Sequence, residues 1–248
     1  MTGERPPILA ITALEGYEVV GSDGKIGVVK DFLFRDDRWQ VRWLVIDTGS
    51  GWLSGRKVLV HPSAVADVDH DRHEILTALT KQQVEDSLDL RNDQKLSTAL
   101  EASLFAHYGW DPDWGRCFFA TTSESLLAPQ GAIGESIDDP HLRSFRVIKG
   151  YRLRATDGEI GGVENFLIDQ AGWNIRYLIV STGAWLMGKE VLLAPFAVLV
   201  IDWLNREILL NVTRDRVKNS PSWDPSQFID ESYEHRLHQH YGWPHYGF

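Results

Sequence analysis

The chain has 248 residues, of which 43% are hydrophobic, and its 35 acidic and 25 basic residues give a formal net charge of −10. This charge disfavours nucleic-acid binding, and no apolar run approaches the roughly 18–20 residues needed to cross a bilayer. The single cysteine, Cys117, excludes an intramolecular disulfide and a multi-cysteine zinc site. Because the N-terminus shows no export signal, we expect a soluble, cytoplasmic protein without membrane insertion, for which peripheral association stays open.

Short strands are predicted first along the chain, and they are Val28–Phe34, Trp39–Asp47, Lys57–Val60 and His73–Leu79. In the second of these, alternation places Trp43 on one side of the strand and Arg42 with Leu44 on the other. A helix is then expected after Thr80, because Gln83 follows at capping-box spacing. Leucines spaced by four, Leu96, Leu100 and Leu104, predict a longer helix with one apolar stripe.

The same elements return in the second half of the chain. The expected strands there are Ile175–Val180, Glu190–Leu193 and Arg206–Val212. Asp224-Pro225 predicts a helix start, and the apolar stripe returns as Ile229, Tyr233 and Leu237. Gly109 and Gly242 stand where a helix C-terminal glycine is expected.

These correspondences indicate an internal duplication. Gly16-Tyr17 recurs as Gly150-Tyr151, and the offset of 134 holds as far as Thr48-Gly49, which recurs as Thr182-Gly183. The offset is then 133, as far as His107-Tyr108-Gly109-Trp110, which returns as His240-Tyr241-Gly242-Trp243. A period of this length is that of a domain, not of a solenoid repeat.

Two tandem domains are therefore predicted, a first copy at 1–110 and a second copy at 141–248. The segment 111–140 between them carries turn and linker signals such as Asp-Pro and Pro-Gln-Gly. The expected fold class is mainly β with α extensions: two small antiparallel β-barrels, each followed by a helical segment.

The ordered motifs of both copies resemble the PRC-barrel domain. The resemblance rests on Gly150–Leu167, Ile175–Val180 and Gly188–Pro195 in the second copy and on Gly16–Leu33, Val41–Thr48 and Gly55–Pro62 in the first. It implies a six-stranded barrel, similar to the cytoplasmic part of the photosynthetic reaction-centre H subunit and to the C-terminal domain of RimM-type ribosome maturation factors. In both of these groups the barrel is a docking and assembly module without shared catalytic residues.

Several local features allow both a structural and a functional interpretation. Asp23-Gly24 and Asp157-Gly158 are interpreted as tight turns in preference to acidic binding loops, and Gly27 and Gly161 as bulge or close-approach glycines.

Arg42 and Arg176 stand on apolar strands of the two copies. They either hold an anionic partner or, as we favour, pair with a carboxylate of their own domain, because buried guanidinium groups need partners.

Tryptophans and basic residues in glycine-rich loops are candidate contacts for a partner protein. The loop of the first copy offers Trp52 and Arg56, and that of the second offers Trp185 and Lys189. The tryptophans are equally compatible with lids that close one end of each barrel. The aromatic ends of the copies add two further candidates, Trp110 and Trp243.

The C-terminal histidines are His235, His238, His240 and His245. Their spacing completes no metal site with a carboxylate or thiol, and Cys117 has no assigned histidine partner, so neither a metal, a cofactor nor a catalytic residue is predicted.

The sequence predicts a non-catalytic protein-interaction or assembly module built from two PRC-barrels. Its partner is another protein, and the two barrels are expected to pack on each other or to self-associate. The alternative is an accessory factor of the bacterial photosynthetic light reaction, by resemblance to the H subunit. A hydrolytic or metal enzyme is a third hypothesis, supported by the histidines alone.

Overall fold

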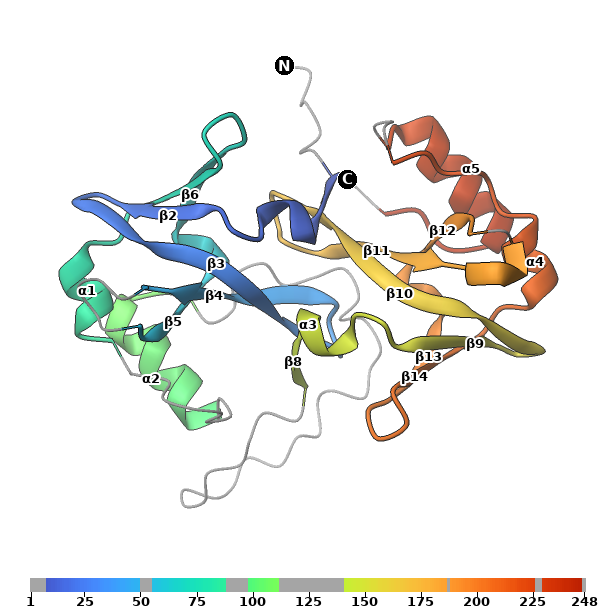
Figure 1. Cartoon of the computed structure of the whole chain (residues 1–248), viewed down its shortest axis with the longest axis horizontal. Helices are drawn as coiled ribbons and strands as arrows, with labels where there is room; N and C mark the ends of the chain where they lie inside the picture. Colours follow the sequence, from blue (N-terminus) through green and yellow to red (C-terminus); the bar gives the residue numbers. More distant parts are fainter. Residues whose placement is uncertain are drawn as a thin grey trace. The chain divides into compact units, whose positions relative to one another are not determined.

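The computed structural model describes residues 8–49, 55–87, 98–111, 141–186, 188–225 and 229–246. Its contacts divide the chain into two compact units (Figure 1). The N-unit is Leu14–Phe145, and the C-unit is Met1–Ala13 together with Arg146–Phe248. None of the helices in the described ranges has the length and apolar character needed to cross a membrane.

The N-unit contains a seven-stranded sheet in the order β5-β4-β3-β2-β7-β6, with β8 against the far half of β3. The strands are β2 (Glu18–Gly21), β3 (Gly24–Arg35), β4 (Gln40–Asp47), β5 (Lys57–Val60), β6 (Val65–Asp69), β7 (Glu74–Thr77) and β8 (Leu142–Ser144). The helices are α1 (Lys81–Glu85) and α2 (Thr98–Tyr108), and a 3₁₀ turn, η2 (Pro62–Ala64), joins β5 to β6. Another 3₁₀ turn, η1 (Ile11–Leu14), leads into the unit.

The C-unit repeats this arrangement in the order β12-β11-β10-β9-β14-β13, with β1 against β10. Its strands are β1 (Ile8–Ala10), β9 (Arg152–Ala155), β10 (Gly158–Asp169), β11 (Ile175–Ser181), β12 (Glu190–Leu193), β13 (Val198–Asp202) and β14 (Glu207–Leu210). Its helical segments are α4 (Arg214–Lys218), α5 (Glu231–Tyr241), η5 (Gly183–Leu186) and η6 (Pro195–Ala197), and α3 (Phe145–Ile148) spans the boundary in sequence between the units.

The fold is mainly β, as the sequence predicts, but neither sheet closes into a barrel. The expectation of purely antiparallel strands is also wrong, because β2 pairs with β7, and β9 with β14, in parallel. The cause is the connection through η2, which takes the chain from β5 at one edge of the sheet to β6 at the other. The β6–β7 hairpin then returns beside β2 in the same direction as that strand.

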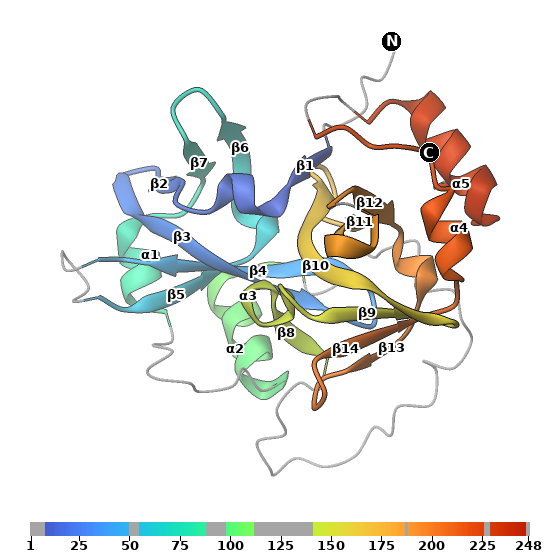
Figure 2. The ribbon, with the colours of Figure 1, turned by 45° about the vertical axis from the view of Figure 1, so that its right-hand side comes forward.

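Each unit contains a strand that belongs to the other copy of the duplicated sequence. Strand β1 lies at the start of the first copy but pairs with β10 of the C-unit, and Figure 2 shows it alongside that strand. Its repeat equivalent, β8, lies at the start of the second copy but pairs with β3 of the N-unit. The pairing registers of these two strands are also equivalent. Ala10 pairs with Leu167, and their repeat equivalents, Ser144 and Leu33, pair with each other. Each of the two copies, 1–110 and 141–248, thus contributes one strand to the sheet of the other.

Two glycines have the close approach expected from the sequence. A Cβ atom on Gly27 would stand 2.3 Å from the carbonyl oxygen of Asp47, and one on Gly161 would stand 2.0 Å from that of Ser181. Both lie beside register shifts, which confirms the interpretation as bulge glycines. In the Asp23-Gly24 turn, glycine has a positive φ as predicted, and the Asp23 carboxylate accepts the backbone N–H of Lys81 at the start of α1.

The helices match the sequence in part. Thr80 caps α1 in a capping box with Gln83, as predicted. The helix expected to open at Asp224-Pro225 begins at Glu231 instead, because Asp230 supplies the capping carboxylate to the N–H of Tyr233. The predicted linker lies outside the described residues from 112 to 140.

Helix α2 covers the N-unit sheet through an aromatic and aliphatic cluster. Trp43 and Leu59 of the sheet pack there against Leu104 and Phe105 of the helix, and Leu142 of the exchanged strand β8 joins them. Helix, sheet and exchanged strand therefore meet at Trp43, whose indole N–H also takes part in a buried polar contact.

Candidate functional site

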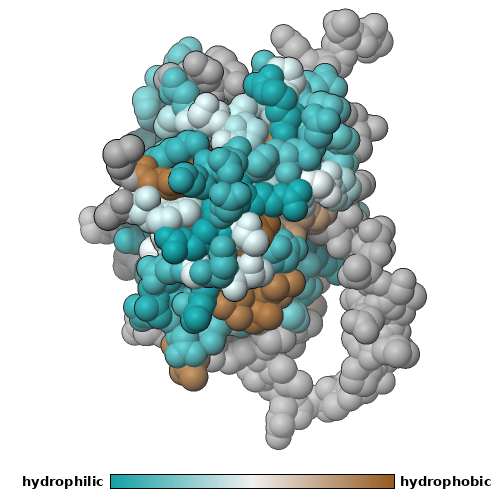
Figure 3. Space-filling model, turned by 90° about the vertical axis from the view of Figure 1, so that its right-hand side faces the viewer, coloured by the Kyte–Doolittle hydropathy of each residue, from teal (hydrophilic) through white to brown (hydrophobic). Residues whose placement is uncertain are grey.

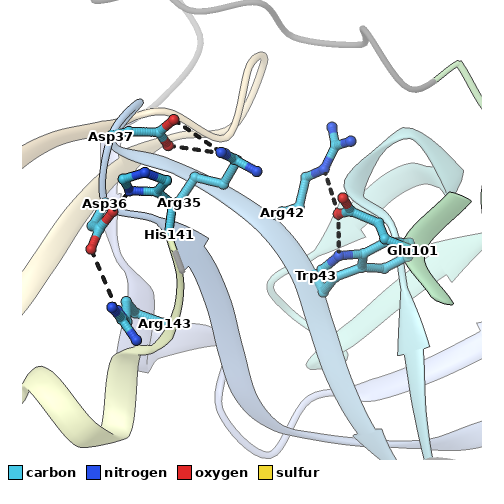
Figure 4. Close-up of polar contacts among 8 residues, drawn as sticks. All are labelled: Arg35, Asp36, Asp37, Arg42, Trp43, Glu101, His141 and Arg143. Atoms are coloured by element: carbon cyan, nitrogen blue, oxygen red, sulfur yellow. Dashed lines mark hydrogen bonds and ion pairs between the residues drawn. The ribbon is translucent and has the colours of Figure 1, made fainter. Parts of the chain in front are cut away.

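A buried ion pair connects α2 to the sheet of the N-unit (Figure 4). Arg42 Nε and Trp43 Nε1 both donate to Oε1 of Glu101, each at 3.0 Å. Arg42 and Glu101 are both only 8% exposed, and the guanidinium also lies over the ring of Phe105, 4.5 Å from its centroid. The pair fixes the helix to the sheet and satisfies both charges inside the unit.

Strand alternation had placed Arg42 and Trp43 on opposite sides, and this expectation is wrong. Phe34 pairs with Val41 and Leu33 with Trp43, so Arg42 is the extra residue of a β-bulge. A bulge changes the direction of the following side chains. Arg42 and Trp43 therefore reach the same carboxylate oxygen.

The C-unit repeats the ion pair with different neighbours. Arg176, also at a bulge, donates from Nη2 to Oε1 of Glu234 at 3.2 Å, and the hydroxyl of Tyr177 takes the place of the indole at 2.9 Å. The Arg176 guanidinium stacks on the ring of Tyr246 at 3.6 Å. Burial, followed by the charges of Tyr246 and Glu234, raises the pKa of Tyr177 far above its usual range, so this hydroxyl stays protonated.

Each unit also buries one histidine beside this ion pair, but from different elements. His61 precedes η2, and His238 belongs to α5; each is 1% exposed. Burial and the charge of Arg42 lower the pKa of His61 to about 3, and burial lowers that of His238. Both imidazoles are therefore neutral at neutral pH. In the repeat, His61 corresponds to Ala194 and His238 to Phe105, so the two imidazoles occupy non-equivalent positions.

Figure 4 also shows a more exposed polar cluster at the β3–β4 turn. His141 Nδ1 lies 2.8 Å from Oδ1 of Asp36, and Arg143 lies 3.4 Å from its other oxygen. Arg35 donates twice to the Asp37 carboxylate, each time at 2.9 Å. Partial burial alone would raise the pKa of Asp37, but the hydrogen bonds and charge of Arg35 outweigh it and lower the pKa.

The ligand atoms of Asp36, Asp37 and His141 lie within 4.8 Å of one another, so these three residues have a spacing that suits a metal ion. Arg35 and Arg143 already neutralise the two carboxylates. A cation would have to displace them, which makes this cluster an ion-pair network that fastens β8 to the turn.

The tryptophan and basic candidates from the sequence have separate surroundings. Trp52 lies outside the described residues. Arg56 binds the carbonyl oxygens of Glu85 and Ser87 at the end of α1. Trp185 is partly buried in η5 beneath the guanidinium of Arg214, 4.7 Å from the ring centroid. Lys189 lies just before β12 and is also partly buried.

Trp110 and Trp243 have equivalent structural surroundings. Trp110 stacks on Tyr108 and Trp243 on Tyr241, with ring centroids 4.1 Å apart in both cases. Each of these two tryptophans therefore packs within its own unit.

The family comparison identifies the first part of the chain. Residues 7–84 match the PRC-barrel domain. A search among curated proteins gives no match. The matched range covers β1 to β7 and reaches into α1, whereas α2 and its Glu101 lie beyond the PRC-barrel domain.

The edge hairpin β13–β14 is a feature that sequence reasoning missed. Leu199 is 61% exposed, Val200 53% and Leu204 92%. In the PRC-barrel domain the repeat equivalents are Ala66, Asp67 and Asp71. The space-filling view of Figure 3 shows hydrophobic patches on a mainly hydrophilic surface. Comparing the two copies position by position would have revealed this substitution of acidic by aliphatic residues.

Proposed function

We propose that this protein is a non-catalytic interaction or assembly module in which the C-unit acts as a second PRC-type domain. The family match to residues 7–84 supports a non-catalytic module. The repeated strand order of the C-unit supports a second domain of the same type. The partner is another protein.

The observation that carries the proposal is the aliphatic hairpin of the C-unit. Leu199 and Val200 lie on β13, which is an edge of the sheet, and Leu204 lies at the tip of the turn. Exposed aliphatic groups at such a position are costly unless a partner covers them, because they invite nonspecific association. The equivalent hairpin of the N-unit, with Asp67 and Asp71, shows that the fold itself does not require them.

The test uses the first copy as a template. The triple variant Leu199→Ala, Val200→Asp, Leu204→Asp gives the C-unit hairpin the residues of the N-unit. We expect wild-type protein to capture a defined partner from native extract, confirmed by reciprocal capture, and the variant to lose it while its thermal unfolding stays cooperative. Sedimentation velocity of both proteins shows whether the partner is a second copy of this chain. Equal capture by wild type and variant would refute the hairpin as the interaction surface.

The photosynthetic alternative stays a prediction, because it depends on the resemblance to the H subunit alone. A role in proton relay gains no support from His61 and His238. Burial lowers the pKa of both imidazoles, so neither binds a proton near neutral pH.

A further inference from the structure

The C-unit contains a cavity of about 410 Å³ beside the exchanged strand. Its walls come from β1, from β10 to β12, and from the segment between α4 and α5. This volume falls within the range of roughly 300–1,000 Å³ that is typical of ligand sites. The walls are mostly apolar, with contributions from Ile8, Leu167, Ile179 and Ile229.

The charged groups of this cavity have one sign. Among the described residues that line it, Glu164 and Glu190 are acidic and none is a lysine, arginine or histidine. Glu164 pairs with Lys149 at 3.4 Å on the surface, where both side chains are about half exposed, at 49% and 43%. Glu190 has no ion pair with the described residues. The cavity therefore offers negative charge next to apolar walls, which suits a cation on an aliphatic stem.

The cavity also contains a hydrogen-bond donor without an acceptor. The indole Nε1 of Trp223 is buried and has no hydrogen-bond partner among the described residues. A buried N–H without an acceptor is unfavourable by roughly 1–3 kcal/mol, so a ligand that brings a carbonyl oxygen to this point is favoured. A peptide backbone supplies such an oxygen, whereas a simple alkylamine does not.

The first copy carries the opposite charge at the equivalent positions. Glu164 corresponds to Lys30 and Glu190 to Lys57. The two carboxylates are therefore not needed to build this part of the sheet, because the same strands form in the N-unit with lysines in their place. Glu164 keeps its ion pair with Lys149, and both carboxylates lie next to the apolar walls of the cavity.

We propose that this cavity binds a segment of a partner protein that carries a lysine or arginine between aliphatic residues. The aliphatic groups contact Ile179 and Ile229, the cation lies near Glu164 and Glu190, and a backbone carbonyl accepts from Trp223. This inference assumes the interaction function proposed above, but it concerns a surface other than the β13–β14 hairpin. Failure of one surface therefore leaves the other testable.

The probe is the peptide acetyl-Leu-Lys-Leu-amide, titrated into the full chain and followed through the tryptophan indole N–H signals in ¹H–¹⁵N NMR spectra. Trp223→Phe assigns the signal of that residue. We expect the Trp223 signal to move downfield as the carbonyl binds. The affinity should fall at least roughly tenfold in the double variant Glu164→Lys, Glu190→Lys, which carries the first-copy residues.

Three controls make the result decisive. Glu159→Lys with Glu207→Lys changes the net charge of the same unit equally but lies outside the cavity lining, and it should bind the peptide like wild type. Acetylating the lysine of the peptide should abolish binding. Equal binding of the acetylated peptide, equal binding by the Glu164 and Glu190 variant, or an unmoved Trp223 signal would overturn the proposal. Binding of n-hexylamine as tight as that of the peptide would overturn the assignment to a protein segment.

Discussion

At the scale of single residues, one carboxylate in each unit organises the contact between helix and sheet. Glu101 accepts from Arg42 and Trp43, and Glu234 accepts from Arg176 and Tyr177. Such buried pairs contribute little net stability against an apolar replacement, but removing one partner leaves a buried charge alone. In this protein the pairs determine which turn of the helix packs against the sheet.

We therefore predict that Glu101→Gln lowers the free energy of unfolding by about 3 kcal/mol, because the Arg42 guanidinium loses its counter-charge. Urea denaturation of the full chain measures the change. Glu18→Gln is the control, since its ion pair with Lys25 is solvent-exposed and its loss should cost less than about 1 kcal/mol. Equal losses in the two variants would contradict the role given to Glu101.

A second prediction concerns pH and His61. The pKa of this imidazole is about 3 in the folded chain and near 6.5 when unfolded, so the unfolded chain binds the proton first as the pH falls. Its neutral form thus contributes stability that is present above pH 6.5 and is lost progressively toward pH 3. Between pH 7 and pH 4.5 the loss should be about 2 kcal/mol.

His61→Asn tests this, because asparagine keeps an acceptor for the N–H of Ser63 and does not titrate. Unfolding free energies at the two pH values should show a smaller loss in the variant than in wild type. An identical loss would assign the acid sensitivity to other groups, such as His238.

At the scale of elements, the sequence predicts the strands and helix caps that are determined by nearby residues. The β-strand core segments and the Thr80 cap are readable from residue type and spacing, because each depends on neighbours a few positions away. The close-approach glycines are readable from residue type, although the carbonyl that each approaches lies on the neighbouring strand. The bulge at Arg42 is not readable in this way, since simple alternation assumes an unbroken ladder. An in-unit carboxylate was expected for Arg42, but its identity as Glu101 depends on helix packing.

The parallel pair β2–β7 and the hairpin surface were missed for a similar reason. Both depend on which strands are neighbours in the sheet. The segments that connect the strands determine this order, and the strand residues themselves do not. The helix start at Glu231 was missed because Asp224 and Asp230 are equally good caps in sequence, and tertiary packing selects between them.

The bulge glycines give a prediction with a neighbouring control. Gly161→Ala should lower the unfolding free energy by more than about 2 kcal/mol, because its Cβ would overlap the Ser181 carbonyl and its φ is 145°. Gly162→Ala should be nearly neutral, since the nearest atom to its Cβ is 3.4 Å away. Thermal unfolding of both variants measures the difference, and similar destabilisation by the two would refute the close-approach argument.

At the scale of the whole molecule, the exchanged strands connect the two copies. We predict that cutting the chain at a protease site inserted near residue 125 leaves the fragments associated. Each compact unit contains one strand from the other fragment, β1 in the C-unit and β8 in the N-unit. Size-exclusion chromatography without denaturant should therefore show one species of full-length mass.

Proline substitutions provide the control for this experiment. Leu9→Pro and Arg143→Pro disrupt the short strands β1 and β8, because proline lacks the N–H needed for a ladder. The cut chain carrying both should separate into fragments. Separation of the cut wild-type chain would show that strand exchange does not hold the copies together.

Strand exchange also sets an order for synthesis at the ribosome. The N-unit sheet stays incomplete until Ser144 has emerged, and Ile8 has no ladder partner until Asp169, which is made much later, follows. The first copy therefore cannot complete its sheet while its own codons alone have been translated. During that interval the far half of β3 has β4 on one edge but no partner on the other. Chaperone binding to the growing chain would then have its greatest effect.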